Sequence, residues 1–283
     1  MDKRESLSAK NDLLFRSLFA DSRNKELLVS FLKSVLLLPE DDYHVIEIVD
    51  PHLLPEFTDD KLAIIDIKLK TKSGKIIHIE VQLEVPGTMK QRIVLYGARL
   101  IAEQIGKGVD YSVIKKVISI IITEETLIKG VSDYHHRFSL YDPKDDTELS
   151  DIYEVHTIEL GKLPKETDGT ELYEWARFIA AETKEEREMA VIKNPKVAEA
   201  VIKLEEMLIS DEARSAYEYR LKMERDKIMW MNEMRERGLE EGMEKGMEKG
   251  LTSTARNMLA DGIPAESVAK YTGLSLEEVK DLC

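Results

Sequence analysis

The spacing of apolar residues changes several times along the chain, and each change marks an expected element. Residues 11–38 and 88–107 carry apolar side chains three and four positions apart, which predicts helices, and the polar stretch 21–24 divides the first one in two. Further along the chain, helical spacing returns at residues 171–183, 197–208 and 211–237.

Shorter stretches rich in β-branched residues predict strands. They lie at residues 44–49, 62–70, 76–83, 117–123, 134–141 and 152–160. The stretch 117–123 is apolar on both faces, as a strand in the middle of a sheet is. The order helix, three strands, helix, strand favours an α/β fold in which helices flank a mixed sheet, followed by an α-helical C-terminal extension.

Polar and apolar positions alternate in the strands at 62–70 and 76–83, so each strand has one apolar and one polar face. A three-residue hairpin loop that ends with Gly74 in the left-handed conformation sets their register. It places Asp66 opposite Glu80, and Lys68 opposite His78, on the polar face.

Gln82 follows on the same face, opposite Ile64 in this register. Directly opposed residues have Cβ atoms about 5 Å apart, so Asp66 and Glu80 would repel each other unless a cation lay between them. A divalent ion such as Mg²⁺ is a suitable cation, because it takes carboxylate oxygens as ligands. The alternative is an ordinary solvated strand face, on which the neighbouring lysines balance the two carboxylates.

Three segments of the chain, together with the strand at 117–123, carry a resemblance to a known family. They are NDLLFRSLFAD (11–21), IIDIKLKTKSGKIIHIEVQL (64–83) and KQRIVLYGARLIAEQIGKGVDY (90–111). Together they resemble the recombination-promoting nuclease and transposase family of the PD-(D/E)XK superfamily, over roughly residues 10–160. The resemblance implies a restriction-endonuclease-like core of order αβββαβ. It also implies that Asp66, Glu80 and Gln82 are catalytic and that Asp66 and Glu80 bind the metal.

The chain departs from the wider superfamily at Gln82, where the motif usually has lysine. Glutamine can position water through hydrogen bonds, but it carries no positive charge. Lys68 and Arg92 could supply that charge, and for both a surface-charge role is the alternative. Asp12 could support the metal or simply favour its helix dipole. Gln91 and Tyr96 match polar positions of the family's next helix, although Tyr96 would also suit the core.

Glycine recurs at every fourth residue in the segment GLEEGMEKGMEKG, at Gly238, Gly242, Gly246 and Gly250. If this segment is helical, the glycines lie beside a row of leucine and methionine, which would suit a close-packed dimer helix. The alternative is a charged tether, because each glycine costs a helix interior about 1 kcal/mol.

Residues 255–282 resemble a helix-turn-helix. Ala269, Gly273 and Val279 have the spacing of that motif, with a small residue at the crossing, glycine in the turn and an apolar residue on the second helix. The second helix would be acidic, whereas helices that read DNA usually carry basic or amide side chains. The segment therefore remains either a DNA reader or a protein-contact module.

Composition excludes some kinds of site and indicates where the protein is found. The chain has 283 residues, a formal net charge of −14 and one cysteine, Cys283, which excludes an internal disulfide and a cysteine zinc site. We find neither a signal-peptide pattern nor an apolar run that could span a bilayer, so we expect a cytoplasmic protein. The acidity lies mainly in residues 131–250, and the first 130 residues are nearly neutral and could present a basic face to phosphates.

We therefore expect a metal-dependent DNA endonuclease that uses Mg²⁺, or else Mn²⁺ or Ca²⁺, and that forms a homo-oligomer through its C-terminal helices. The resemblance implies cleavage that promotes recombination, in mobile-element or defence settings. The alternative is a nuclease-like scaffold with weak or no activity that acts as a dimerising DNA- or protein-binding regulator. The expected domains are a core at 1–165, a helical extension at 166–237, the repeat at 238–250 and a helix-turn-helix-like module at 251–283.

Overall fold

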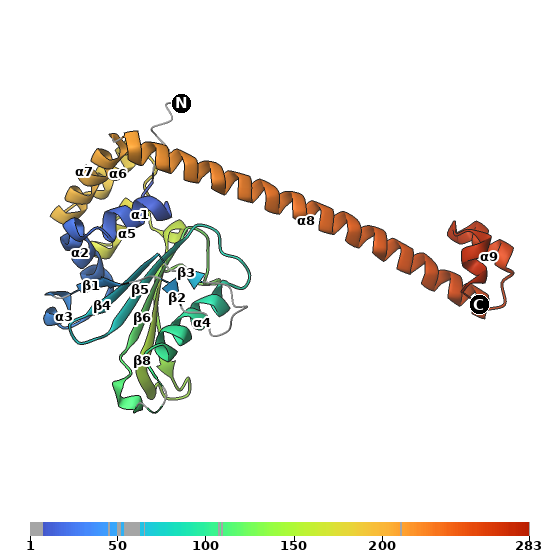
Figure 1. Ribbon diagram of the computed structural model, residues 1–283, viewed down its shortest axis with the longest axis horizontal. Helices are drawn as coiled ribbons and strands as arrows, with labels where there is room; N and C mark the ends of the chain where they lie inside the picture. The colour runs from blue at the N-terminus through green and yellow to red at the C-terminus, as the bar shows by residue number, and fades with distance from the viewer. Residues whose placement is uncertain are drawn as a thin grey trace. The chain divides into compact units, whose positions relative to one another are not determined.

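The computed structural model describes residues 8–44, 46–49, 52–53, 63–64, 66–106, 108, 110–209 and 211–282. Its contacts divide the chain into two compact units, Met1–Arg214 and Ser215–Cys283. Figure 1 labels the elements of both units. Within the described part of the chain, none of the helices combines the length and apolar character that crossing a membrane requires.

A six-stranded mixed sheet forms the centre of the first unit, in the order β1-β4-β5-β6-β8-β7. Its strands are β1 (Ile46–Val49), β4 (Ile67–Thr71), β5 (Ile76–Gln82), β6 (Val117–Thr123), β7 (His135–Tyr141) and β8 (Glu148–Glu159). β5 pairs antiparallel with β4, whereas β6 is parallel to both β5 and β8. The predicted mixed sheet flanked by helices is thus confirmed.

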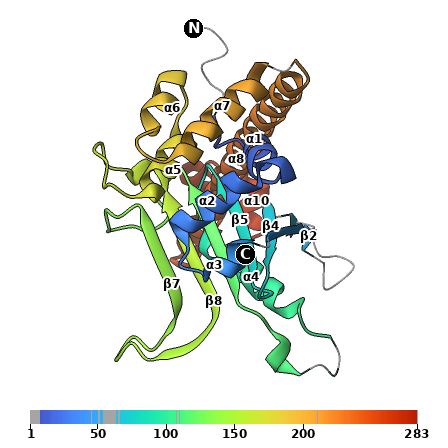
Figure 2. The same ribbon diagram turned by 90° about the vertical axis from the view of Figure 1, so that its left-hand side faces the viewer.

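Seven α-helices and three short 3-10 helices are described in the first unit. The α-helices are α1 (Asp12–Phe19), α2 (Lys25–Val35), α3 (Glu40–His44), α4 (Met89–Ala102), α5 (Glu171–Ala180), α6 (Lys184–Ala190) and α7 (Pro195–Ile209). The 3-10 helices are η1 (Ser22–Asn24), η2 (Tyr111–Val113) and η3 (Leu160–Lys162). Figures 1 and 2 show α4 on one side of the sheet and α1, α2 and α5 on the other.

Aromatic side chains from helices far apart in sequence meet on the α2 side of the sheet. Phe19, Phe31 and Trp175 are fully buried, and the Phe19 ring lies 5.6 Å from Phe31 and 5.5 Å from Trp175, measured between centroids. Such contacts explain why the apolar stripes of α1, α2 and α5 form one core.

The α4 side has a narrower apolar contact with the sheet. The residues of α4 that are buried recur at helical spacing: Met89, Ile93, Gly97 and Leu100. At Gly97 a Cβ atom would lie 2.2 Å from Cζ of Tyr153 on β8, so only glycine lets the two backbones approach this closely. This contact fixes how α4 lies over the strands.

The register predicted for the β4–β5 hairpin is confirmed where its residues pair. Lys68 is opposite His78, and Gly74 in the connecting loop has a φ of 88°. The predicted strand at 62–70, however, is not continuous. Ala63–Ile64 form a separate strand, β3, which pairs with β2 (His52–Leu53), and Asp66 lies in a bend before β4.

The predicted placement of Gln82 opposite Ile64 is therefore wrong. The described β4–β5 pairing reaches only to Ile67 and Ile79, and Ile64 lies in the separate β2–β3 sheet, where it pairs with His52. The physical reason lies at the bend, where Oδ2 of Asp66 accepts a hydrogen bond from the backbone N–H of Val81 at 2.7 Å. A side chain thus satisfies an amide that lies beyond the last backbone pair of the hairpin.

Other boundaries also differ from the prediction. Residues 40–44 form α3, although 44 was assigned to a strand, and α6 was not predicted. Thr183 and Glu186 make a capping box that starts α6. α4 ends at Ala102 instead of residue 107. Just after this end, the Gln104 side-chain amide donates to the Leu100 carbonyl and accepts from the Lys115 N–H.

The second unit contains most of α8 (Asp211–Ala260), together with α9 (Ala265–Thr272) and α10 (Leu276–Lys280). α8 runs through the glycine repeat as one helix of 50 residues. Its C-terminal end packs against α9 and α10 through the buried side chains Ala255, Val268 and Val279. Gly273 takes the left-handed conformation after α9, as the turn position of the motif requires.

Candidate active site

Glu80 lies on the central strand β5 and faces α4. Its side chain is only 10% exposed, and the Arg92 guanidinium on α4 donates a hydrogen bond from Nη2 to Oε1 of Glu80. The same Nη2 donates to Oε1 of Gln82 at 2.6 Å. One guanidinium from the helix therefore joins the two polar side chains that alternation places on this face of the strand.

Asp66 lies beside this group because the bend places it directly before the first residue of β4. Its Oδ2 atom is held by the Val81 N–H, one residue beyond Glu80. Burial raises the pKa of Glu80, the Arg92 guanidinium lowers it, and the negative charge of Asp66 raises it again. The net pKa of Glu80 is above its ordinary value, because burial outweighs the contact with Arg92.

Tyr96 completes the α4 wall of this group. The Arg92 guanidinium lies over the Tyr96 ring, 5.8 Å from the ring centroid. Burial and the nearby charge of Glu80 raise the pKa of Tyr96. The ring also packs beside Leu100 and Val117, so Tyr96 has the core role considered as its alternative as well as a contact with the site.

The structure places the remaining predicted residues in different surroundings. The Lys68 ammonium donates to Oε2 of Glu103 at 2.9 Å, and both side chains are mostly buried. Gln91 is exposed on α4. Asp12 begins α1, and its side chain lies outside the described residues. The contact that sequence reasoning missed is Glu103, whose distance of 35 residues from Lys68 gives no local signal.

His78 belongs to a buried hydrogen-bonded chain beneath the site. Its Nε2 atom is bonded to Oγ of Ser119, which donates to the Tyr153 hydroxyl at 3.1 Å, and that hydroxyl donates to the Ile93 carbonyl at 2.9 Å. Burial, together with the charge of Lys68, lowers the pKa of His78 to about 3. The neutral ring therefore links the strands to α4.

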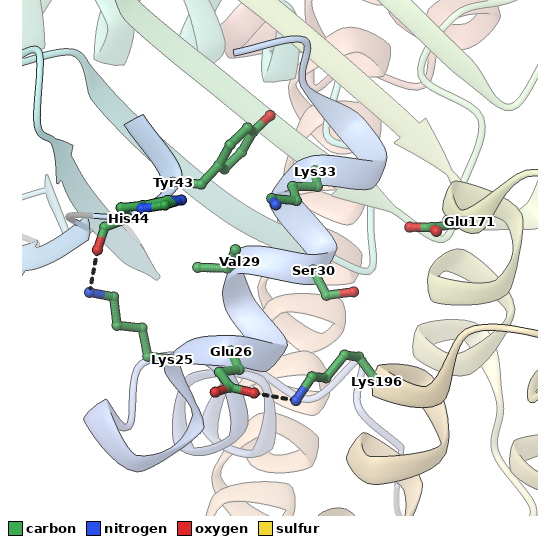
Figure 3. Close-up of a pocket in the computed structure, with 9 residues that line it drawn as sticks. All are labelled: Lys25, Glu26, Val29, Ser30, Lys33, Tyr43, His44, Glu171 and Lys196. Atoms are coloured by element: carbon green, nitrogen blue, oxygen red, sulfur yellow. Dashed lines mark hydrogen bonds and ion pairs between the residues drawn. The ribbon is translucent and has the colours of Figure 1, made fainter. Parts of the chain in front are cut away.

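The described cavity of about 390 Å³ lies elsewhere, between α2, α3, α5 and α7, and contains none of the predicted site residues (Figure 3). Lys25, Lys33 and Lys196 line it. Each lysine ammonium already has a partner, since Lys25 donates to the His44 carbonyl, Lys33 to Glu40 and Lys196 to Glu26. We therefore place the chemistry at Glu80 rather than in this cavity.

Asp66 and Glu80 together fit a hard divalent cation. They bring two carboxylates close enough for the charge of one to raise the pKa of the other. Among the described residues, no group of three or more His, Cys, Asp or Glu side chains could hold a metal. A pair of carboxylates suits an ion such as Mg²⁺, which is bound through one or two carboxylates and keeps several waters.

Two family models match the chain. Residues 9–234 match the PD-(D/E)XK nuclease family transposase model, a range that includes every predicted site residue. Residues 254–283 match the C-terminal HTH domain of the Rpn/YhgA-like nuclease family. No curated protein and no solved structure matched the chain.

Proposed function

Because the chain belongs to the PD-(D/E)XK nuclease family transposases, we propose that it is a metal-dependent endonuclease that hydrolyses phosphodiester bonds in DNA. The observation that carries the proposal is the meeting of Asp66 and Glu80 at the end of the β4–β5 hairpin. The two carboxylates lie close enough for the charge of Asp66 to act on the buried Glu80, and a divalent cation between them would offset this repulsion.

Asp66 and Glu80 would hold the ion through their carboxylates. When bound, such an ion neutralises charge on the phosphate and lowers the pKa of water, so that a nucleophile forms near neutral pH. The bend at Asp66 keeps one carboxylate oxygen on the Val81 N–H, which orients the side chain. Glu80 is oriented by its strand, so the protein holds both ligands in advance of binding.

Gln82 and Arg92 would act on the reacting groups. The Gln82 amide can orient the attacking water, and the Arg92 guanidinium can supply the positive charge that the superfamily's lysine usually brings. Support comes from the hydrogen bond between Arg92 and Gln82 and from the Arg92 side chain, which is 31% exposed and so within reach of a phosphate.

The second candidate function is a nuclease-like scaffold that regulates DNA or a protein partner without cutting. The observation that favours it is the same guanidinium, because Arg92 already neutralises part of the charge of Glu80 and could reduce its affinity for metal. The two functions differ in one measurable property, the dependence of strand cleavage on a divalent ion.

The test is incubation of supercoiled plasmid with the purified protein in Mg²⁺, Mn²⁺ or Ca²⁺, with EDTA as the metal-free control. We expect nicked or linear DNA only with metal, and at least about a hundredfold less with Asp66→Asn, which keeps the hydrogen-bond acceptor but removes the charge. Asp133→Asn, on an exposed loop, is the matched control and should cleave like the parent. Cleavage by Asp66→Asn at the parental rate would remove Asp66 from the proposed site.

DNA is the proposed partner, since both matched families point to DNA binding. We propose further that cleavage promotes recombination between DNA molecules, in a mobile-element or defence setting. Recombinant frequency between two marked plasmids should rise with the parent protein and not with Asp66→Asn. Equal frequencies with the two proteins would separate recombination from the nuclease activity.

A further inference from the structure

Several large apolar residues in the described part of α8 are exposed, and they form regular rows. Leu239, Met243 and Met247 are 65–70% exposed and follow one another at every fourth position. Beside them runs a second row, which begins with Trp230 and Met234, 61% and 49% exposed. Exposed apolar side chains that follow one another along a helix mark a surface suited to contact with a partner.

The second row continues as the four glycines of the repeat, Gly238, Gly242, Gly246 and Gly250. A Cβ atom added at any of them would meet nothing within 4 Å. In α4 the opposite holds, because a Cβ at Gly97 would collide with Tyr153. Helical glycine in this chain thus serves close packing at Gly97, and the four in α8 lack such a neighbour among the described residues.

These glycines would destabilise an isolated helix. Each costs about 1 kcal/mol relative to alanine in a helix interior, so the four together cost about 4 kcal/mol. A partner that approaches closely along the glycine row would offset this cost, because the missing side chains let two backbones come together. Only a slender partner such as another helix fits a row of this kind.

We propose that this partner is α8 of a second copy of the chain, packed antiparallel and crossing at the glycine repeat. The row has large residues at one end, Trp230 and Met234, and glycines at the other, so reversing one copy places large side chains over glycines. Met234 of each copy then lies over Gly246 of the other, and Trp230 lies towards Gly250. In a parallel pair glycines would also face glycines, but Trp230 and Met234 of one copy would meet Trp230 and Met234 of the other at one end of the row.

Charge favours the same orientation. The row on the other side of the glycines carries charges of both signs: Glu233, Arg237, Glu241, Lys245 and Lys249. Glu233 is paired with Arg237 of its own helix at 2.7 Å. Reversal of one copy brings Glu233 level with Lys245 and Arg237 level with Glu241, whereas a parallel pair would bring like charges level. The complementarity between two identical helices is the reason to choose a second copy as the occupant.

The four-residue spacing of the rows also determines the angle at which the two helices cross. Four residues turn a helix by about 40° beyond a full turn, so the rows wrap around α8 instead of following its axis. Rows of this kind interdigitate when helices cross at about −50°. A heptad coiled coil, which needs apolar residues every 3.5 positions, is therefore not the expected form.

The mass of the full chain, measured by light scattering across a concentration series, tests the proposal. We expect a dimer that Gly242→Leu weakens at least tenfold, although leucine favours helix and circular dichroism should show no loss of helix. Glu240→Leu is the matched control, since residue 240 lies on the opposite side of α8, and it should leave the dimer intact. A monomeric parent, or equal dimerisation of the two leucine variants, overturns the proposal.

The orientation has its own test. Glu233→Lys should weaken the dimer, and the double variant Glu233→Lys with Lys245→Glu should restore it, because antiparallel packing places these positions level. Failure of the double variant to recover would reject antiparallel packing. These readouts measure mass rather than cleavage, so they stand whether or not the chain proves to be a nuclease.

Discussion

The two faces of the central sheet are built for different purposes. On the α2 side the strands and helices meet through fully buried apolar and aromatic residues such as Phe31 and Trp175. On the α4 side, strand β5 carries Glu80, Gln82 and His78. Arg92 of α4 donates hydrogen bonds to Glu80 and Gln82. The α2 side is thus apolar throughout this contact, whereas the α4 side combines apolar packing with charged groups that cost free energy to bury.

The largest expected effect is on the α2 face. Phe31→Ala should lower the free energy of unfolding by about 3–5 kcal/mol, because it removes a fully buried ring that contacts Phe19 and Trp175. Urea unfolding followed by fluorescence measures the loss. Metal-dependent cleavage, assayed well below the unfolding midpoint, should stay close to the parent, and a proportionate loss of cleavage would mean that the two faces are not separable.

The opposite result is expected at Glu80. Glu80→Gln should reduce cleavage by about a hundredfold or more, since it removes a charged metal ligand. Stability should be unchanged or slightly higher near neutral pH, because the raised pKa shows that the folded protein disfavours the ionised carboxylate. Urea unfolding of both proteins provides the check, and a loss of several kcal/mol would make Glu80 a structural residue.

Gly97 should affect both stability and cleavage, because it allows α4 to pack on β8 and α4 carries a residue of the site. Gly97→Ala puts a Cβ atom 2.2 Å from the Tyr153 ring, which two hydrogen bonds hold in place. We expect a loss of about 1–3 kcal/mol in stability. Cleavage should fall as well, because α4 carries Arg92. Gly87→Ala, with open space around it, is the control and should change neither quantity.

Asp42 offers the smallest effect and a pH dependence. Burial alone would raise the pKa of Asp42, but hydrogen bonds from Lys75 at 2.5 Å and from the Ser73 N–H at 2.9 Å lower it to about 2. A lowered pKa contributes stability above the unfolded value near 4 and loses it as the pH falls towards 2.

Asp42→Asn should therefore cost about 2 kcal/mol at pH 7, and the difference from the parent should shrink between pH 4 and pH 2. Asp41→Asn is the control, because that side chain is 78% exposed in its contact with Lys72 and should contribute less than about 1 kcal/mol. A difference between Asp42→Asn and the parent that persists at pH 2 would show that charge is not its cause.

Local pattern was enough to predict much of the fold and the core of the candidate site. Alternation along β4 and β5, with Gly74 in the turn, predicted the register and put Glu80 and Gln82 on one face, because side-chain direction repeats every two residues in a strand. Helical spacing likewise predicted α4, and the spacing of the helix-turn-helix motif predicted the buried Val279 of the C-terminal unit.

What only the tertiary structure decided are the contacts between segments that lie far apart in sequence. The bend at Asp66, the pairing of β3 with β2 and the bond between Lys68 and Glu103 have no periodicity of their own. Arg92 reaches Glu80 and Gln82 only because α4 docks where Gly97 meets Tyr153, 56 residues away. Periodicity specifies which way a side chain points, whereas its partner depends on how whole elements pack.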